Sequence, residues 1–473
     1  MQEAKIYFGS TPATKEQKAP VKSPFNDKIE GYYPVCDAQD AQKALQIAQK
    51  AFKKHSNKVP LSQRIAWLRD VARSLKEQKE EFALTITKEI GKPIAFSRVE
   101  VQRAIETIEL SADFAVSMMG ETINTDATPS GRGTMSFYKR VPVGVAVAIT
   151  PFNFPLNLSA HKLAPALVAG NALVYKPTPE APLTGYNLAK LFIESKYAIP
   201  DMLSVVYGDA EVGDALVSSP IPRKISFTGS VQVGRIITQR AGIKRLSLEL
   251  GGNAATYIDQ SADISQAASR CAVGAFVNSG QVCISLQRIY VHESVYEEFA
   301  QALAEDTKRL KVGDPYEPDT FMGPLINEEA AKRAERWVQS AIEAGARPIL
   351  EGKREGRYFY PAILADVQDD MPIICEEVFA PIVSLVKVSG YEEAIAKMND
   401  SPYGLQFSIF TKDIDLIKRF VDDAEAGGVV INDIPTLRFD IQPYGGVKLS
   451  GIGREGPKFA LEEFTEIKSV IIV

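Results

Sequence analysis

The segment NSGQVCISLQR, residues 278–288, places one cysteine beside a glycine and small polar residues, directly after a run with helical spacing. A cysteine reacts as its thiolate, which requires a partly open and electropositive site. Cys283 is therefore a candidate nucleophile, although a lone cysteine is more commonly a small buried side chain without chemistry. A cysteine hydrolase would also need a histidine base, and neither His161 nor His292 has the sequence context of a protease histidine.

Two further polar residues lie at the ends of apolar, strand-like runs. Glu249, in LSLELGG, stands beside two glycines. A carboxylate there is costly unless it is paired or its pKa is raised, and a raised pKa suits a general base. The alternative is a structural carboxylate with its hydrogen bonds satisfied. Asn153, in PFNFP, could donate its amide to a developing oxyanion or cap the helix that follows.

Two other segments are candidates for binding phosphate or ribose. FTGSVQVG, residues 227–234, follows a strand and begins a helix, but its two glycines are five residues apart and lack the three-glycine dinucleotide pattern. Helix N-termini attract anions, so Gly229 and Ser230 are candidates to hold a pyrophosphate. An ordinary strand-to-helix turn that binds no ligand is equally consistent with this segment. Lys176, in NALVYKP, could reach a cofactor or lie on the surface before a proline-rich turn.

Strands that alternate with helical segments surround these residues. The apolar runs that each precede helical spacing are 142–150, 171–177, 202–208 and 224–229. This alternation predicts a parallel sheet with right-handed crossovers, and a second alternating block covers 261–430. The outer segments are expected to be an extended N-terminus (1–40), amphipathic helices (37–54 and 60–120) and a C-terminal strand (467–473) that pairs with another subunit.

Composition argues against several classes of protein. The 473 residues predict two or three domains, and a net charge of -5 without a basic stripe argues against nucleic-acid binding. No apolar stretch has roughly the 18 residues of a membrane helix, and no secretory signal is visible. Four scattered cysteines do not form a disulfide framework, so we expect a cytoplasmic location. The three histidines are far apart in the sequence and do not predict a zinc site.

Taken together and in this order, the motifs resemble those of the aldehyde dehydrogenase superfamily. The resemblance covers at least 141–456: PFNFP at 151, KPTPEAPLT at 176, FTGSVQVG at 227, LELGG at 248, GQVC at 280, EEVFAP at 376 and PYGGVKLSGIGREG at 443. It implies an α/β fold with a Rossmann-like cofactor domain, an α/β catalytic domain and a small β oligomerisation arm. The expected domains are cofactor-binding (1–121 and 141–250), catalytic (251–442) and arm (122–140 and 457–473), in a homodimer or homotetramer.

The resemblance also assigns roles to residues. It implies that the chain oxidises an aldehyde to a carboxylic acid with NAD or NADP, through a thiohemiacetal and a thioester on Cys283. Glu249 is implied as the general base and Asn153 as an oxyanion-hole donor, together with the backbone N–H of the cysteine. The implied cofactor contacts are Lys176, Gly229, Ser230, Glu377 and Phe379.

Two positions depart from the family's pattern. Many NAD-preferring members carry a glutamate three residues after the ribose-binding lysine, whereas this chain has Pro179 there and Glu180 one place later. Loss of that carboxylate removes a repulsion against a 2′-phosphate, so NADP becomes credible beside NAD. Ala380 stands where glycine is common, and we infer nothing functional from it.

His161 and Arg438 fall where the family lines or opens its aldehyde tunnel. A polar residue in place of the common aromatic one, together with a cation, favours a short polar or anionic aldehyde such as lactaldehyde, glyceraldehyde 3-phosphate or a semialdehyde. A surface ion pair is the alternative for Arg438. Two other functions stay open: a CoA-acylating aldehyde dehydrogenase, which often lacks the glutamate at position 249, and a non-catalytic cofactor-binding protein on the same scaffold.

Overall fold

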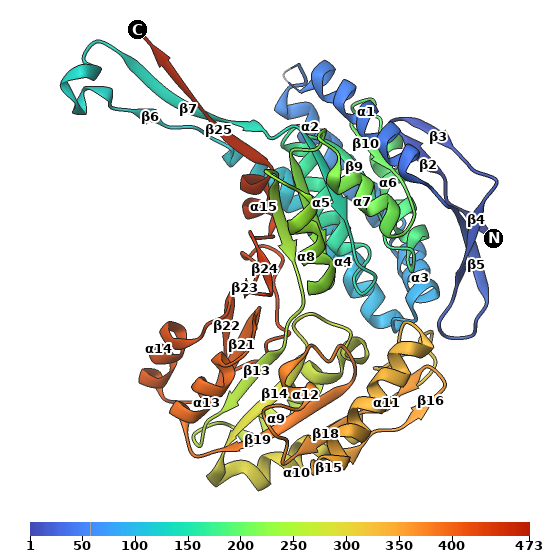
Figure 1. Cartoon of the computed structure of the whole chain (residues 1–473), viewed down its shortest axis with the longest axis vertical. Helices are drawn as coiled ribbons and strands as arrows, with labels where there is room; N and C mark the ends of the chain where they lie inside the picture. The colour runs from blue at the N-terminus through green and yellow to red at the C-terminus, as the bar shows by residue number, and fades with distance from the viewer. Residues whose placement is uncertain (57) are drawn as a thin grey trace.

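The computed structural model describes residues 1–56 and 58–473, and most of its strands gather in two large sheets. Figure 1 shows one α/β body around each sheet and an extended arm that projects away from both. The arm consists of β6 (Thr122–Ile123), β7 (Met135–Pro142) and β25 (Thr465–Ile472). The predicted α/β fold class, with a Rossmann-like body, a second α/β body and a small β arm, is confirmed.

The first sheet has eight strands in the order β24–β12–β11–β8–β9–β10–β2–β3. Its five parallel strands are β12 (Arg245–Glu249), β11 (Lys224–Thr228), β8 (Val145–Ile149), β9 (Ala172–Lys176) and β10 (Leu203–Val205). Antiparallel strands β24 (Gly451–Ile452), β2 (Ile6–Phe8) and β3 (Thr11–Ala13) extend it. The strand order reverses between β8 and β11, and ligands of such sheets bind outside the carboxyl ends of the strands at this reversal.

Helices cover both faces of this sheet, as the alternating pattern predicts. The crossover helices are α5 (Asn157–Val168), α6 (Pro182–Glu194), α7 (Ala210–Ser218) and α8 (Val231–Arg240). The N-terminal helices are α1 (Ala38–His55), α2 (Leu61–Glu77), α3 (Lys79–Ile90) and α4 (Ile94–Phe114). α5 and α6 contact α2, α3 and α4, whereas α7 contacts α1 and α8. None of the helices in the described residues combines the length and apolarity that a bilayer span requires.

The second sheet has seven strands in the order β15–β18–β19–β14–β13–β21–β22. They are β15 (Arg347–Glu351), β18 (Ala362–Ala365), β19 (Ile382–Val388), β14 (Leu286–His292), β13 (Ala254–Ile258), β21 (Gln406–Phe410) and β22 (Gly428–Ile431), and only the edge strand β15 is antiparallel. Its helices are α9 (Ile264–Phe276), α10 (Tyr296–Lys308), α11 (Glu328–Glu343), α12 (Pro372–Cys375), α13 (Tyr391–Asn399) and α14 (Ile414–Asp423).

The two ends of the chain form extended structure, as expected. Residues 2–34 supply β2 and β3 and a separate sheet of β1 (Gln2–Glu3), β5 (Ile29–Pro34) and β4 (Lys18–Lys22). In the arm, β25 pairs with β7 over eight residues, from Thr465 opposite Pro142 to Ile472 opposite Met135. Within 457–473 only β25 joins the arm, because α15 (Pro457–Glu463) buries Ala460 and Leu461 and contacts α4 and α5. The domain boundaries stay a prediction.

The turn that carries PFNFP is held by a buried carboxylate from α4. Glu100 accepts hydrogen bonds from the backbone N–H groups of Leu156, at 2.9 Å, and Asn157, at 3.2 Å. These N–H groups belong to the first turn of α5 and have no partner within the helix. Glu100 is paired with Lys92, and both side chains are fully buried. This pair fixes the start of α5 and therefore the position of Asn153 just before it.

Candidate active site

A cavity of about 790 Å³ lies between the two bodies. Its volume falls within the range of about 300–1,000 Å³ typical of ligand pockets. Residues after β8 and β11 line it, so it lies at the point where the strand order of the first sheet reverses. Seven of the predicted site residues line the cavity: Asn153, Lys176, Gly229, Ser230, Cys283, Glu377 and Phe379.

Cys283 lies on a loop that the fold holds in a strained conformation. Asn278, Ser279 and Gly280 are three successive residues with left-handed backbone, at φ 51°, 55° and 71°. A Cβ on Gly280 would lie 2.2 Å from the carbonyl oxygen of Ala380, so glycine is required there. The amide of Asn153 donates to the carbonyl of Gln281 at 3.0 Å. The loop ends where β14 begins, which places the cysteine at the amino edge of the second sheet.

The surroundings of the Cys283 thiol set its ionisation. Burial raises its pKa to about 11, against the lowering effects of a hydrogen bond with Tyr444 and the positive charge of Arg438. The charges of Glu377 and Glu249 raise it further. The resting thiol is therefore neutral near pH 7, and attack on a substrate requires transfer of its proton to a base.

Glu249 is a buried carboxyl group at the carboxyl end of β12. It is 3% exposed, and within the described residues neither of its oxygens has a hydrogen-bond partner. Burial raises its pKa well above the usual range, and the neighbouring charge of Glu455 raises it further. A Cβ on Gly445 would lie 2.9 Å from one carboxyl oxygen, so Gly445 leaves the space that Glu249 occupies. A carboxyl group in this state can accept a proton near neutral pH.

The cofactor-binding candidates lie where a dinucleotide would cross the edge of the first sheet. Gly229 and Ser230 precede α8, and the Ser230 hydroxyl accepts from the Val233 N–H at 3.3 Å, which caps the helix. Lys176 ends β9; burial lowers its pKa while Glu180 and Asp209 raise it. Thr228, also on the cavity wall, has a buried hydroxyl without a partner in the described residues. A helix N-terminus, a cation and an unpaired hydroxyl fit a phosphorylated cofactor.

The opposite wall carries Glu377 and Phe379. The Gly252 N–H donates to Glu377 at 3.1 Å, and a Cβ on Gly251 would lie 2.4 Å from the same carboxylate, so the two glycines allow its close approach. Burial raises the pKa of Glu377 to about 7. Phe379 has a left-handed backbone, φ 49°, and its ring packs edge-on against Phe152 with centroids 6.0 Å apart.

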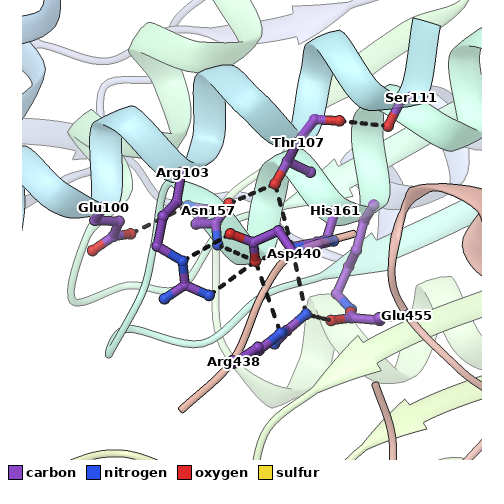
Figure 2. A network of polar contacts seen from close by, with 10 residues as sticks. Glu100, Arg103, Thr107, Ser111, Asn157, His161, Arg438, Asp440 and Glu455 are labelled. Carbon is purple, nitrogen blue, oxygen red and sulfur yellow. Dashed lines mark hydrogen bonds and ion pairs between the residues drawn. The ribbon is translucent and has the colours of Figure 1, made fainter. Parts of the chain in front are cut away.

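His161 and Arg438 lie in a buried polar network that Figure 2 shows converging on Asp440. His161 is 1% exposed, and its Nε2 lies 2.9 Å from Asp440 and 3.3 Å from an Arg438 nitrogen. Arg103 contributes two hydrogen bonds to the same carboxylate, at 2.8 and 2.9 Å. Taken over residues 1–56 and 58–473, the cavity lining includes neither His161 nor Arg438. The side chains of His161 and Arg438 contact residues of this network, and Arg438 also lies over the ring of Tyr444.

Several residues of this site have no counterpart among the predicted ones. Tyr444, Asp440 and Glu455 contact the predicted residues Cys283, His161 and Arg438 respectively. Lys162 is paired with Glu455 at 2.7 Å. Tyr444 and Glu455 stand inside the quoted segment PYGGVKLSGIGREG, so a motif marked the region but not the contacts. Lys162 directly follows His161 on α5, and nothing in its sequence context signals a buried charge.

A nucleotide-sized cavity at a strand reversal is typical of a nucleotide-dependent enzyme, and a cysteine lies on its facing wall. A family model described as the aldehyde dehydrogenase family matches residues 11–470. The chain belongs to the aldehyde dehydrogenase family and is an NAD(P)-dependent oxidoreductase. The predicted family, enzyme class and cofactor type are confirmed.

Individual relatives agree with this membership. The chain is 41% identical over 469 residues to a 3-sulfolactaldehyde dehydrogenase of Priestia aryabhattai, covering 99% of this chain and 97% of the relative. It is 41% identical over 456 residues to a lactaldehyde dehydrogenase of Methanococcus aeolicus, covering 96% of each. Among solved structures, a glyceraldehyde-3-phosphate dehydrogenase of Methanocaldococcus jannaschii complexed with NADP has a TM-score of 0.93 and 40% identity, covering 97% of this chain and 100% of that one.

Proposed function

We propose that this aldehyde dehydrogenase converts a short polar or anionic aldehyde to its carboxylic acid by hydrolysis of a thioester on Cys283. The observation that carries the proposal is the meeting of Cys283, Glu249 and Asn153 at the facing edges of the two sheets, beside one cavity. Cys283 and Asn153 line that cavity, and Glu249 is near enough for its charge to act on the thiol.

The first half of the reaction joins the aldehyde to the cysteine. The Cys283 thiol loses its proton to solvent, the thiolate sulfur attacks the aldehyde carbon, and a tetrahedral oxyanion forms. The amide of Asn153 has two N–H donors, one of which holds Gln281. The other N–H, with the backbone N–H of Cys283, is in place to stabilise the oxyanion.

The second half completes the oxidation. Lys176, Gly229, Ser230, Glu377 and Phe379 would hold NAD(P), which would accept the hydride when bound. Loss of the hydride from the thiohemiacetal leaves a thioester on Cys283. Glu249 then takes a proton from water, which attacks the thioester carbon and releases the acid. The two unpartnered oxygens of Glu249 support this role, because they are available to a water molecule. The glutamate at position 249 argues against a CoA-acylating enzyme, in which CoA would replace water as the acyl acceptor. It also argues against a non-catalytic cofactor-binding protein.

The substrate class rests on two supports. By name, the relatives act on 3-sulfolactaldehyde, lactaldehyde and glyceraldehyde 3-phosphate, which are short polar aldehydes. In this chain the positive charge of Arg438 acts on Cys283, so a negative group on the substrate would be attracted toward the reacting atom. His161 supports that charge indirectly, by contacting both Arg438 and Asp440.

The preference between NAD and NADP depends on Glu180 as well as on Pro179. Its side chain lines the cavity, accepts a hydrogen bond from the Thr178 hydroxyl and raises the pKa of Lys176 by its charge. A carboxylate is therefore present near the ribose-binding lysine, although one position later in the chain. We propose that both NAD and NADP bind and that Glu180 disfavours the 2′-phosphate of NADP.

The arm supports the proposal of a homodimer or homotetramer. In the described residues β25 pairs on one side only, and Ile467, Ile471 and Ile472 on it are 61%, 66% and 50% exposed. An apolar strand with an unpaired edge is a template for association with another chain. A second copy of this chain is the proposed partner.

Replacing Cys283 by Ser is expected to abolish turnover, because a serine hydroxyl is much less acidic than a thiol and its neutral form is a poor nucleophile at neutral pH. Reduced cofactor is followed by absorbance with lactaldehyde, glyceraldehyde 3-phosphate, hexanal and benzaldehyde. The wild type should prefer the first two, and Cys36→Ser and Cys271→Ser should keep activity. Near-normal turnover by Cys283→Ser would contradict the nucleophile, and preference for hexanal or benzaldehyde would contradict the substrate class.

Glu249→Gln keeps the shape of the side chain and removes the base. The variant is expected to reduce at most one cofactor per site in a burst and then stall, because the thioester is not hydrolysed. Mass spectrometry of the Cys283 peptide should find the acyl group. Glu462→Gln, an exposed glutamate on α15, is the control that should turn over normally. Full steady-state turnover by Glu249→Gln would show that another group activates the water.

Glu180→Gln is expected to raise kcat/KM with NADP relative to NAD by about tenfold, since one fewer negative charge near the 2′-phosphate is worth about 1.4 kcal/mol. Pro179→Glu adds a carboxylate and should shift the same ratio toward NAD. Initial rates with the two cofactors side by side measure both effects. If the ratio moves in the same direction in both variants, or in neither, this account of the cofactor site is wrong.

Ile471→Asp is expected to lower the molar mass of the particle in solution, because a charge on the exposed edge strand opposes pairing with a second arm. Size-exclusion chromatography with light scattering measures it. Ile243→Asp is the matched control, because Ile243 is also an exposed isoleucine but lies after α8, away from the arm. Equal masses for the wild type and both variants would argue against the arm as the contact.

A further inference from the structure

Tyr444 makes direct contact with the sulfur of Cys283. Its phenol oxygen lies 2.9 Å from Cys283 Sγ, and its side chain is buried, with the residue 5% exposed. Two backbone hydrogen bonds with Glu455 hold the residue in place, at 3.0 and 2.6 Å. A contact this short is within hydrogen-bond range, and the fixed backbone keeps the phenol against the sulfur.

Arg438 lies over the face of the same ring. Its guanidinium carbon is 3.6 Å from the centre of the Tyr444 ring, and its side chain is 8% exposed. Asp440 and Glu455, at 3.8 and 3.6 Å, hold the guanidinium there. A cation on the face of an aromatic ring is attracted to its π electrons and draws density from it, which makes a phenol O–H a stronger donor.

The direction of the hydrogen bond follows from the two groups. A thiol is a weak donor, whereas a thiolate is a strong acceptor for an O–H group. Burial raises the pKa of Tyr444 well above its ordinary value, and the Cys283 charge raises it further, so the phenol keeps its proton when the thiol ionises. The Tyr444 O–H therefore donates to the Cys283 thiolate.

We propose that Tyr444 is a further catalytic residue, whose O–H stabilises the Cys283 thiolate, and that Arg438 is the positioning residue that holds and polarises this phenol. The proposal rests on the proposed role of Cys283 as nucleophile. It gives Arg438 a task in ionising the nucleophile, in addition to any attraction for a negative substrate.

The proposal predicts a particular pH dependence. Four groups act on Cys283: Tyr444 and Arg438 favour its thiolate, and Glu377 and Glu249 oppose it. Removing the phenol O–H therefore raises the pKa of the thiol. As sulfur attacks a carbon it loses its negative charge, so the hydrogen bond matters most to the free thiolate. Activity should fall most at low pH and recover as pH rises.

The test measures the thiolate directly in the full-length protein. Alkylation by iodoacetamide is followed against pH by mass spectrometry of the Cys283 peptide, which separates it from the exposed Cys375. Tyr444→Phe should shift the profile upward by about one pH unit, so that alkylation at pH 7.5 is about tenfold slower. Tyr290→Phe is the matched control: its phenol also lies beside a buried arginine, Arg288, but does not touch Cys283. An unchanged profile in Tyr444→Phe would overturn the proposal.

Three further variants keep the test independent of folding. Difluorotyrosine placed at position 444 keeps the shape of the ring and is a more acidic donor, so it should shift the profile downward, opposite to phenylalanine. Arg438→Lys keeps a cation and should leave the profile near that of the wild type, whereas Arg438→Met should shift it upward. A fluorinated phenol that shifts the profile upward, or leaves it unchanged, would refute the donor role.

The measurement also separates this proposal from the one on which it rests. If Cys283→Ser keeps its dehydrogenase activity, the nucleophile is wrong, and the proposal for Tyr444 falls with it. If Cys283→Ser is inactive and Tyr444→Phe has the wild-type alkylation profile, the nucleophile stands and Tyr444 is only a packing residue. The pH profile of kcat/KM for Tyr444→Phe should follow the alkylation profile.

Discussion

The burial of charge between the two bodies is the constraint on which the active site depends. A buried charge is tolerated only when a partner and hydrogen bonds compensate it. Here Asp440 meets Arg103, His161 and Arg438, and Glu455 meets Lys162. Loss of any one partner would leave a charge uncompensated and displace the rest. The loop after β22 is consequently held against α4 and α5, far from it in the chain.

The charges of this network act on the ionisation of Glu249 and Cys283. Burial opposes the charge of Glu455, but Lys162, His161 and Arg438 outweigh it and lower its pKa to about 2. Burial and the charge of Glu455 raise the pKa of Glu249, which makes its carboxylate a stronger base. The same set of cations favours the Cys283 thiolate through Arg438. One cluster therefore acts on both the proposed base and the proposed nucleophile of a thioester mechanism.

The sequence was sufficient for those parts of the structure that depend on local pattern. Apolar runs followed by helical spacing predicted the parallel sheet, and helical spacing from residue 37 predicted α1, which Asp37 caps. Motifs that resemble a known family placed the cavity residues. The contacts of His161 and Arg438 escaped prediction, because their partners are set by packing between segments about 280 residues apart. Tyr444 escaped because its role depends on a single side-chain distance that no spacing along the chain expresses.

Strand register ties the cofactor half of the site to the chemical half. The Gly229 N–H donates to the carbonyl of Glu249 at 3.0 Å, so the turn before α8 is bonded to the residue that carries the proposed base. On the other side of β12, Glu249 pairs with Gly451 of β24, and Leu250 donates to Ser450 at 2.9 Å. A slip of one residue would turn the carboxyl group to the opposite face of the sheet. The ladder that places the segment bearing Tyr444 and Glu455 therefore also aims Glu249, the proposed base, and holds the turn that is proposed to bind the cofactor.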